Sequence, residues 1–253
     1  MARFTDKVAL ITGGTRGIGY ATAALFAREG AGVVICGRDE GRLTTATAEL
    51  ETLGGPVAGV RCDVGSEQDV ERLFSEVLDL FGGLDVCVCN AGIETDEEYS
   101  IFDLPPAVFD ENMRTNVRGV YLTSQGAARA MKSTGGTIVV VGSSSGIIAD
   151  VTAPSPTYDA TKAAVHMFAK ALALELAPYG IRVNTVAPGW IETDMTAAEM
   201  DDPEMVASWL ERIPLHRLGQ PAEVAEVIAF LASEQASYMT GSVVSVDGGE
   251  TVI

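Results

Sequence analysis

The chain has 253 residues, of which 47% are hydrophobic and 21% charged. This composition is typical of a soluble globular protein with a substantial core and excludes a largely disordered one. The formal net charge of −18 repels nucleic acid and anionic membrane surfaces, so we expect neither as a partner. Because no segment reaches about 18 uninterrupted apolar residues and no apolar run follows a basic start, we expect a cytoplasmic protein.

Seven short apolar runs alternate with stretches of helical pattern along the chain. The predicted strands are residues 7–12, 31–36, 56–62, 84–90, 136–142, 181–187 and 241–246. Most are almost continuously apolar, as expected when both faces of a sheet are covered. The alternation predicts an α/β fold with a doubly wound, seven-stranded parallel sheet flanked by helices. No linker, charge block or repeat divides the chain, so we expect a single domain over residues 1–253.

A glycine-rich turn, TGGTRGIG at residues 12–19, directly follows the first predicted strand. Its glycines would let the backbone approach a pyrophosphate, and the N-terminus of the next helix would offer free N–H groups. The spacing GxxxGxG differs from the common GxGxxG pattern. We therefore expect a variant of the dinucleotide-binding fold.

Two arginines bear on the choice of cofactor. Gly37 and Arg38 stand where NAD-binding relatives of this fold carry an acidic residue, and Arg16 lies within the glycine turn. Two cations beside one expected 2′-phosphate favour NADP(H), although NAD(H) remains possible and both arginines could be ordinary surface cations. Asp39 and Glu40 follow directly and weaken the positive field.

Tyr158 and Lys162 are four positions apart in the sequence, so on a helix they would share one face. Such a pair can be an ordinary feature of a surface helix or a catalytic unit.

A metal site is not expected, because the cysteines lack paired CxxC spacing and the two histidines belong to no metal-binding pattern. The four cysteines, expected as reduced core thiols, are Cys36, Cys62, Cys87 and Cys89.

The segment of residues 188–221 is longer than an ordinary connection between a strand and a helix. Their tryptophans and methionines would give them an adaptable apolar surface. We expect either a substrate lid over about residues 190–215 or a helical pair packed on the sheet edge. The residues concerned are Trp190, Met195, Met200, Met205 and Trp209.

Eight motifs, in order, resemble those of the short-chain dehydrogenase/reductase family over essentially the whole chain. They are TGGTRGIG (12–19), CDV (62–64), CNAG (89–92), TNVRG (115–119), GSSSG (142–146), YDATK (158–162), RVNTVAPGWIET (182–193) and MTGSVVSVDGG (239–249). The resemblance implies a Rossmann-like fold, a nicotinamide cofactor, and hydride transfer between that cofactor and a carbonyl or alcohol. It also suggests a homotetramer, in which helices around 108–131 and 157–177 could pair with their symmetry mates.

The resemblance assigns roles to four catalytic residues. Tyr158 would be the general acid and base, and Lys162 would lower its pKa and bind the nicotinamide ribose. Ser143 would hold the reacting oxygen, and Asn116 would hold a water in a proton path. The serine is chosen because the family's serine stands three places before a glycine, here Gly146. The commonest distance to the tyrosine would instead select Ser145.

The same resemblance assigns the cofactor contacts. The turn residues would hold the phosphates, Asp63 and Val64 the adenine, and residues 90–92 the adenosine ribose region. The loop after the sixth strand would hold the nicotinamide amide. The predicted contacts are Gly13, Thr15, Arg16, Gly17, Ile18, Gly19, Arg38, Asp63, Val64, Asn90, Ala91, Gly92, Tyr158, Lys162, Pro188, Gly189, Ile191 and Thr193.

Several functions are compatible with these motifs. We expect an NADP(H)-dependent oxidoreductase that acts on a small-molecule carbonyl or alcohol. The chain also resembles 3-oxoacyl-[acyl-carrier-protein] reductases. Because acyl carrier proteins are acidic, such a reductase should carry a basic docking patch around the mouth of its active site. At two positions expected there, where cations would favour docking, this chain has Thr134 and Tyr179 instead. A catalytically silent dinucleotide-binding regulator is a further alternative. An extended-family epimerase or dehydratase fits poorly, because the chain ends soon after VDGG.

Overall fold

A seven-stranded parallel sheet forms the centre of the protein, described here from a computed structural model over residues 2–95, 99–151 and 154–252. The strand order is β3-β2-β1-β4-β5-β6-β7. The strands are β1 (Val8–Thr12), β2 (Gly32–Gly37), β3 (Val57–Arg61), β4 (Val86–Cys89), β5 (Gly136–Val141), β6 (Ile181–Pro188) and β7 (Val243–Val246). Because the order reverses between β1 and β4, a crevice is expected at their carboxyl ends.

All seven predicted strands are present. Four are shorter than predicted by one or two residues and the fourth by three, whereas the second is shifted by one residue and the sixth is one residue longer. The fourth begins at Val86, directly after Asp85. Its carboxylate accepts hydrogen bonds from the Val8 backbone N–H and from Lys7 Nζ, both at 2.9 Å. The seventh begins at Val243, after Gly241 has adopted a φ of 74°.

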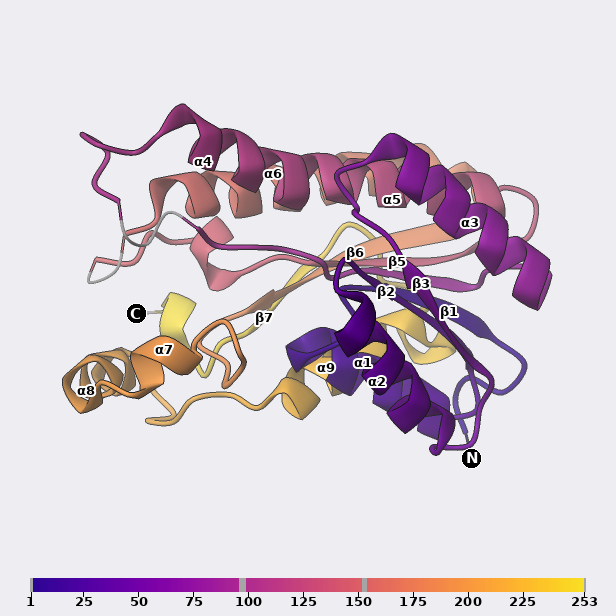
Figure 1. Ribbon diagram of the computed structural model, residues 1–253, viewed down its shortest axis with the longest axis horizontal. Helices are drawn as coiled ribbons and strands as arrows, with labels where there is room; N and C mark the ends of the chain where they lie inside the picture. The colour runs from indigo at the N-terminus through magenta and orange to yellow at the C-terminus, as the bar shows by residue number, and fades with distance from the viewer. Residues whose placement is uncertain (1, 96–98, 152–153, 253) are drawn as a thin grey trace.

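Helices cover both faces of the sheet, as Figure 1 shows. One layer contains α3, α5 and α6, and the other contains α1, α2 and α9. The main helices are α1 (Gly17–Arg28), α2 (Glu40–Glu51), α3 (Glu67–Phe81), α4 (Pro106–Asn112), α5 (Gly119–Met131), α6 (Pro156–Leu176), α7 (Ala197–Met200), α8 (Pro203–Arg212) and α9 (Pro221–Ala232). A π-helical stretch, Met113–Arg118, joins α4 to α5. Short 3-10 turns occupy Ser144–Gly146, Ala177–Tyr179, Glu234–Ala236 and Glu250–Val252.

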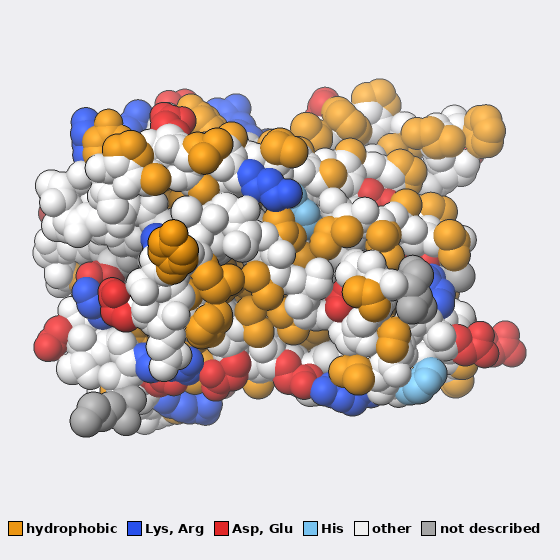
Figure 2. Space-filling view, turned by 180° about the vertical axis from the view of Figure 1, so that it is seen from behind, with side chains coloured by type: hydrophobic (Ala, Val, Ile, Leu, Met, Phe, Trp, Pro, Cys, Tyr) orange, Lys and Arg blue, Asp and Glu red, His pale blue; other side chains and the backbone are white. Residues whose placement is uncertain are grey.

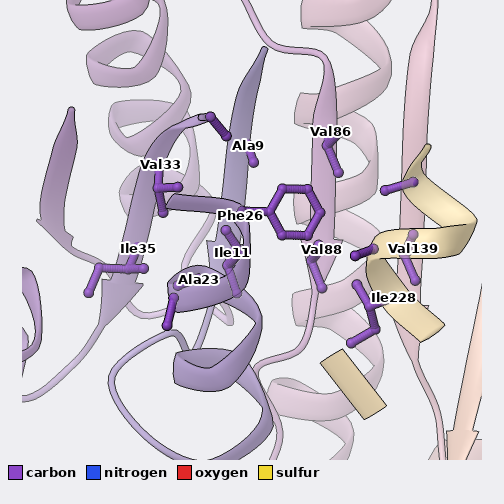
Figure 3. Close-up of a cluster of buried hydrophobic side chains, with 14 of the residues drawn as sticks. Ala9, Ile11, Ala23, Phe26, Val33, Ile35, Val86, Val88, Val139 and Ile228 are labelled. Atoms are coloured by element: carbon purple, nitrogen blue, oxygen red, sulfur yellow. The ribbon is translucent and has the colours of Figure 1, made fainter. Parts of the chain in front are cut away.

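The hydrophobic core lies on both sides of the sheet. On the α1 side, Phe26 is fully buried and packs against side chains of β1 and β4, including Ile11 and Val88 (Figure 3). The opposite core contains all four cysteines, which are buried and free. Within the part of the chain that the structure describes, no helix is long and apolar enough to cross a membrane.

The segment after β6 leaves the sheet and forms α7 and α8 beyond its carboxyl end. The C-terminal turn returns to the same place, where Glu250 lies 3.4 Å from Arg212 of α8 (Figure 1). Trp190 stacks on Trp209 with ring centres 4.0 Å apart. The fold therefore gathers α7, α8 and the C-terminal turn at the edge of the sheet where a ligand crevice is expected.

Candidate active site

A cavity of about 920 Å³ opens at the carboxyl ends of the strands. It is lined by residues that directly follow β1, β2, β3, β4, β5 and β6. Every site residue predicted from the sequence lines this cavity except Asn116. Sequence positions as distant as Gly13 and Thr193 are thus brought together in one site.

The glycine turn forms one wall of the cavity. Gly13 and Gly17 have positive φ angles of 64° and 53°, which favour glycine. A Cβ on Gly19 would lie only 2.3 Å from the Gly13 carbonyl oxygen, so this position requires glycine for close packing of the helix on the turn. The open backbone and the N-terminus of α1 suit the pyrophosphate of a dinucleotide.

Asn90 braces this turn from β4. Its Nδ2 donates hydrogen bonds to the carbonyl oxygens of Thr12, at 2.9 Å, and Gly13, at 3.2 Å. Thr12 Oγ1 in turn accepts hydrogen bonds from the backbone N–H groups of Asn90 and Ala91. Both side-chain donors of Asn90 are therefore used to join β4 to β1, a role that the sequence motif alone did not reveal.

Three arginines surround the cavity beyond the end of β2, and each faces a carboxylate. Arg16 lies 3.2 Å from Asp194, and Arg38 lies 3.5 Å from Glu111. The third, Arg42, was not predicted from the sequence. All three side chains are more than half exposed. Exposed pairs of this kind contribute about 1 kcal/mol or less, so an incoming phosphate can replace them.

Tyr158 and Lys162 lie on the first turns of α6, at the opposite end of the cavity. Lys162 Nζ is 5.3 Å from the centre of the Tyr158 ring and donates a hydrogen bond to the Val141 carbonyl oxygen at 3.2 Å. Both residues are buried. Burial lowers the pKa of Lys162 to about 8, against the opposing charge of Glu94.

Asn116 lies in the π-helical stretch, behind the cavity wall. Its Oδ1 accepts a hydrogen bond from the Ile93 N–H at 2.8 Å, and its Nδ2 donates to the Ile93 carbonyl oxygen and to Thr161. Gly92 separates it from the lysine, since a Cβ there would lie 3.4 Å from Asn116 Oδ1 and 3.6 Å from Lys162 Nζ. Short π-helical segments are frequent at functional sites.

The three consecutive serines after β5 all line the cavity. Ser143 Oγ accepts a hydrogen bond from the Ser145 N–H at 3.1 Å, and the Ser143 N–H donates to His166 Nε2 at 3.4 Å. Burial, with the charges of Lys162 and Lys170, lowers the pKa of His166 to about 4. This neutral histidine supports the serine turn, a function that its sequence context did not indicate.

Comparison with known proteins places this site in a family. A family model described as "Enoyl-(Acyl carrier protein) reductase" matches residues 13–251. The chain is 40% identical to L-rhamnose 1-dehydrogenase (NAD(P)(+)) of Azotobacter vinelandii, covering 96% of each chain, and 41% identical to 3-oxoacyl-[acyl-carrier-protein] reductase FabG of Aquifex aeolicus, covering 98% of each. The crystal structure of a short-chain type dehydrogenase/reductase from Mycobacterium marinum superposes with a TM-score of 0.94 at 40% identity, over 99% of this chain and 97% of that one.

The chain belongs to the short-chain dehydrogenase/reductase family. It is an NAD(P)-dependent oxidoreductase that acts on CH–OH groups. The sheet order and the seven parallel strands confirm the fold expected from the sequence.

This short-chain dehydrogenase/reductase also carries a buried charge network that its motifs did not indicate. Glu250, from the C-terminal turn, accepts a hydrogen bond from Trp190 Nε1 at 3.1 Å and lies 3.4 Å from Arg212 Nη2. Arg212 Nη2 also donates to Asp150 at 2.6 Å. Burial raises the pKa of Glu250. Sequence reasoning missed Glu250 because it follows the last family motif and meets its partners only in the folded chain.

The segment of residues 190–215 contributes Trp190, Met195, Met205 and Trp209 to the cavity wall. Met200 is absent from that wall, and its sulfur lies 3.9 Å from Thr196 Oγ1. Within the described residues of this reductase, no group of three or more metal-ligating side chains is placed to hold a metal ion.

One expectation about the cavity mouth is wrong. Thr134 and Tyr179 precede β5 and β6, so they lie at the amino edge of the sheet, opposite the cavity. Gly135 approaches Gly180 there, and Lys132 Nζ lies 5.9 Å from the centre of the Tyr179 ring. Parallel strands put both residues at the far end, where they cannot border the mouth.

Proposed function

We propose that this protein is an NADP(H)-dependent oxidoreductase that transfers a hydride between the nicotinamide and a carbonyl or alcohol of a small molecule. The observation that carries the proposal is the pairing of a buried Tyr158 with the ammonium of Lys162 in the wall of a dinucleotide-sized cavity. The adenine half of the cofactor is thus assigned to one end of the site, and the nicotinamide and the reaction to the other.

The reaction divides between the cofactor and the protein. When bound, the nicotinamide supplies or accepts the hydride. The Tyr158 hydroxyl donates its proton to the substrate oxygen during reduction and accepts one during oxidation. The nearby Lys162 ammonium favours the phenolate form that this exchange requires.

Ser143 is proposed to orient the substrate oxygen. Because its Oγ accepts a hydrogen bond from Ser145, its own proton remains to be donated. Such a donor stabilises charge that develops on the oxygen in the transition state. Asn116 is proposed to order the path by which Lys162 exchanges protons with solvent, with its side chain fixed by Ile93 and Thr161.

The preference for NADP(H) rests on Arg16, Arg38 and Arg42. The 2′-phosphate would displace the surface carboxylates that now face these guanidinium groups. The remaining predicted contacts, which line the same cavity, are proposed to hold the adenine, riboses and nicotinamide amide as the family resemblance implies.

Three further properties belong to this proposal. Residues 190–215 are proposed to act as a substrate lid, because the stacked Trp190 and Trp209, the second of them on α8, line the cavity.

A homotetramer is supported by large hydrophobic side chains exposed on α5 and α6, among them Tyr121, Met167 and Leu174. Figure 2 shows that hydrophobic side chains also gather across the middle of one face of the molecule, below the upper helix layer. A cytoplasmic location is supported by four free cysteines, which are typical of a reducing compartment.

A panel of ketones, aldehydes, sugars, alcohols and a 3-oxoacyl thioester, followed by NADPH and NADH absorbance in both directions, tests the proposal. We expect turnover of at least one small carbonyl or alcohol, with loss of that turnover in Tyr158→Phe. Cofactor binding without turnover of any panel member would instead support a dinucleotide-binding regulator. Exclusive use of the acyl thioester would favour the 3-oxoacyl-[acyl-carrier-protein] reductase alternative.

A further inference from the structure

The catalytic end of the cavity has an unusual charge balance. Four carboxylate residues line it around Tyr158: Glu94, Asp150, Asp159 and Glu250. Among the cavity-lining residues that the structure describes, the cations are the three arginines at the adenine end and Lys162. The ammonium of Lys162 already lies over the Tyr158 ring and donates a hydrogen bond to the Val141 carbonyl oxygen. An anionic substrate would therefore enter a negative field without a spare cation to receive it.

Arg212 does not reverse this balance. Its guanidinium is held by Asp150 and also lies against Glu250, so one positive charge serves two carboxylates. Buried ion pairs of this kind are costly to break because each charge has already lost its water. A substrate carboxylate or phosphate would have to displace Asp150 or Glu250 to reach it.

Two buried polar atoms at this end have no hydrogen-bond partner in the described structure. They are Glu250 Oε2, an acceptor, and Trp209 Nε1, a donor. Both residues line the cavity, and their side chains are 5% and 1% exposed. The Ser144 hydroxyl lies close to the same carboxylate and favours its charged form. Unsatisfied buried groups are rare in native proteins, and beside a ligand cavity a ligand can supply the missing partner.

An aromatic surface lies beside these polar atoms. Trp190 stacks on Trp209 at an interplanar angle of 16° and also lines the cavity. The Trp190 N–H is held by Glu250, which fixes the orientation of the ring. A flat aromatic face next to hydrogen-bonding groups matches a ring that has an apolar C–H face and a rim of hydroxyl groups.

From these contacts we infer that the substrate is a neutral, unphosphorylated polyhydroxylated ring, a free sugar, and that Glu250 determines this specificity by accepting a hydrogen bond from one of its hydroxyl groups. This inference rests on the proposed function and names its substrate class. During oxidation the C–H hydride passes to the oxidised cofactor, and the O–H proton passes to Tyr158. The carbon becomes a carbonyl, and the two electrons leave with the hydride.

Matched neutral and anionic sugars test the inference with the wild-type enzyme alone. We expect kcat/KM with NADP⁺ to be at least about tenfold higher for D-glucose than for its anionic ring analogues D-glucuronate and D-glucose 6-phosphate. Binding of the same sugars to the enzyme, measured by calorimetry, should show the same order. Equal use of neutral and anionic sugars would overturn the inference.

The residue assignment is tested with Glu250→Gln, which keeps the shape of the side chain but removes its charge. We expect kcat/KM for the neutral sugar to fall about tenfold or more relative to that for cyclohexanol, mainly through KM. Glu175→Gln, an exposed substitution on α6 with the same change in net charge, is the control. An equal fall for sugar and cyclohexanol would remove Glu250 from sugar recognition.

The outcomes separate this inference from the proposed function. If simple ketones or alcohols are turned over in a Tyr158-dependent way but no neutral sugar is bound or oxidised, the inference fails and the proposed function stands. If no carbonyl or alcohol is turned over at all, the proposed function fails. Should Glu250→Gln not fold, Glu250→Asp replaces it with the same expected ratio, because the shorter side chain withdraws the carboxylate from its position in the cavity wall.

Discussion

The ammonium of Lys162 lies 5.3 Å from the centre of the Tyr158 ring, one helical turn along α6, and the lysine is buried in the wall of the cavity. The lysine therefore acts on the phenol through a medium that screens charge less than water does. The same burial makes the charged lysine costly to hold, so its benefit to the reaction and its cost to stability have one cause.

Replacing Tyr158 with Phe should lower kcat by about 10² to 10⁴, because the proton donor is lost while the ring remains. The dissociation constant for NADPH should change little. Stopped-flow turnover and fluorescence titration measure the two quantities. Turnover close to that of the wild type would remove Tyr158 from the mechanism.

Replacing Lys162 with Met should stabilise the folded protein at pH 7 while abolishing most activity. The difference between the ordinary lysine pKa of 10.5 and the folded value of about 8 corresponds to at most roughly 3 kcal/mol. Below pH 8 both folded and unfolded chains carry the charge, and the variant has its full advantage. Between about pH 8 and 10.5 the folded wild type releases the proton first, so its stability rises and the advantage shrinks.

Urea unfolding of the wild type and of Lys162→Met at pH 7 and pH 9.5 tests this prediction. The gain in the free energy of unfolding should be clearly smaller at the higher pH. A gain that is the same at both values would show that burial of the charge is not its source.

Replacing Arg38 with Asp should shift cofactor preference from NADPH toward NADH. The new carboxylate repels a 2′-phosphate and accepts a hydrogen bond from a 2′-hydroxyl. The ratio of kcat/KM for the two cofactors is the measurement. Arg42→Ala should shift the ratio in the same direction by less, and a wild-type enzyme that already prefers NADH would contradict the proposal.

Replacing Ser143 with Ala should lower kcat by roughly 10² or more. Ser145→Ala should cost less, because Ser145 contributes its backbone N–H to Ser143 and that group survives the substitution. Steady-state kinetics of the two variants decide between them. A larger loss at Ser145 would show that sequence distance to the tyrosine identifies the serine better than distance to Gly146.

The wild type should have the mass of four chains in light scattering at micromolar concentration. Leu174→Glu places a charge on an exposed hydrophobic position of α6 and should reduce that mass. Glu175→Gln should leave it unchanged. A wild-type monomer would refute the proposed tetramer.

Much of the fold and of the site could be predicted because the decisive patterns are local. The strands are short apolar runs, and Tyr158 and Lys162 are one helical turn apart. The glycine turn must use glycine at position 19, where a Cβ would touch the Gly13 carbonyl. In each case the reason is contained in a few consecutive residues, or in a motif whose neighbours identify it.

The remaining features depend on contacts between distant segments. Glu250 meets Arg212 and Trp190 only because the segment after β7 returns beside them in the folded chain, and no spacing in the sequence reports that contact. Arg42 faces Asp39 and Asp194 through the first turn of α2. The expected position of Thr134 and Tyr179 at the cavity mouth was wrong because it ignored strand direction. Both residues precede a strand, and in a parallel sheet such residues lie at the edge opposite the cavity.

The stacked pair of Trp190 and Trp209 has a practical consequence. These are the only two tryptophans in the chain, and both border the same cavity. The tryptophan fluorescence of the protein therefore originates entirely from side chains that border this cavity. Quenching of that emission, or energy transfer to a reduced nicotinamide, would report each binding step in real time without an added dye or label.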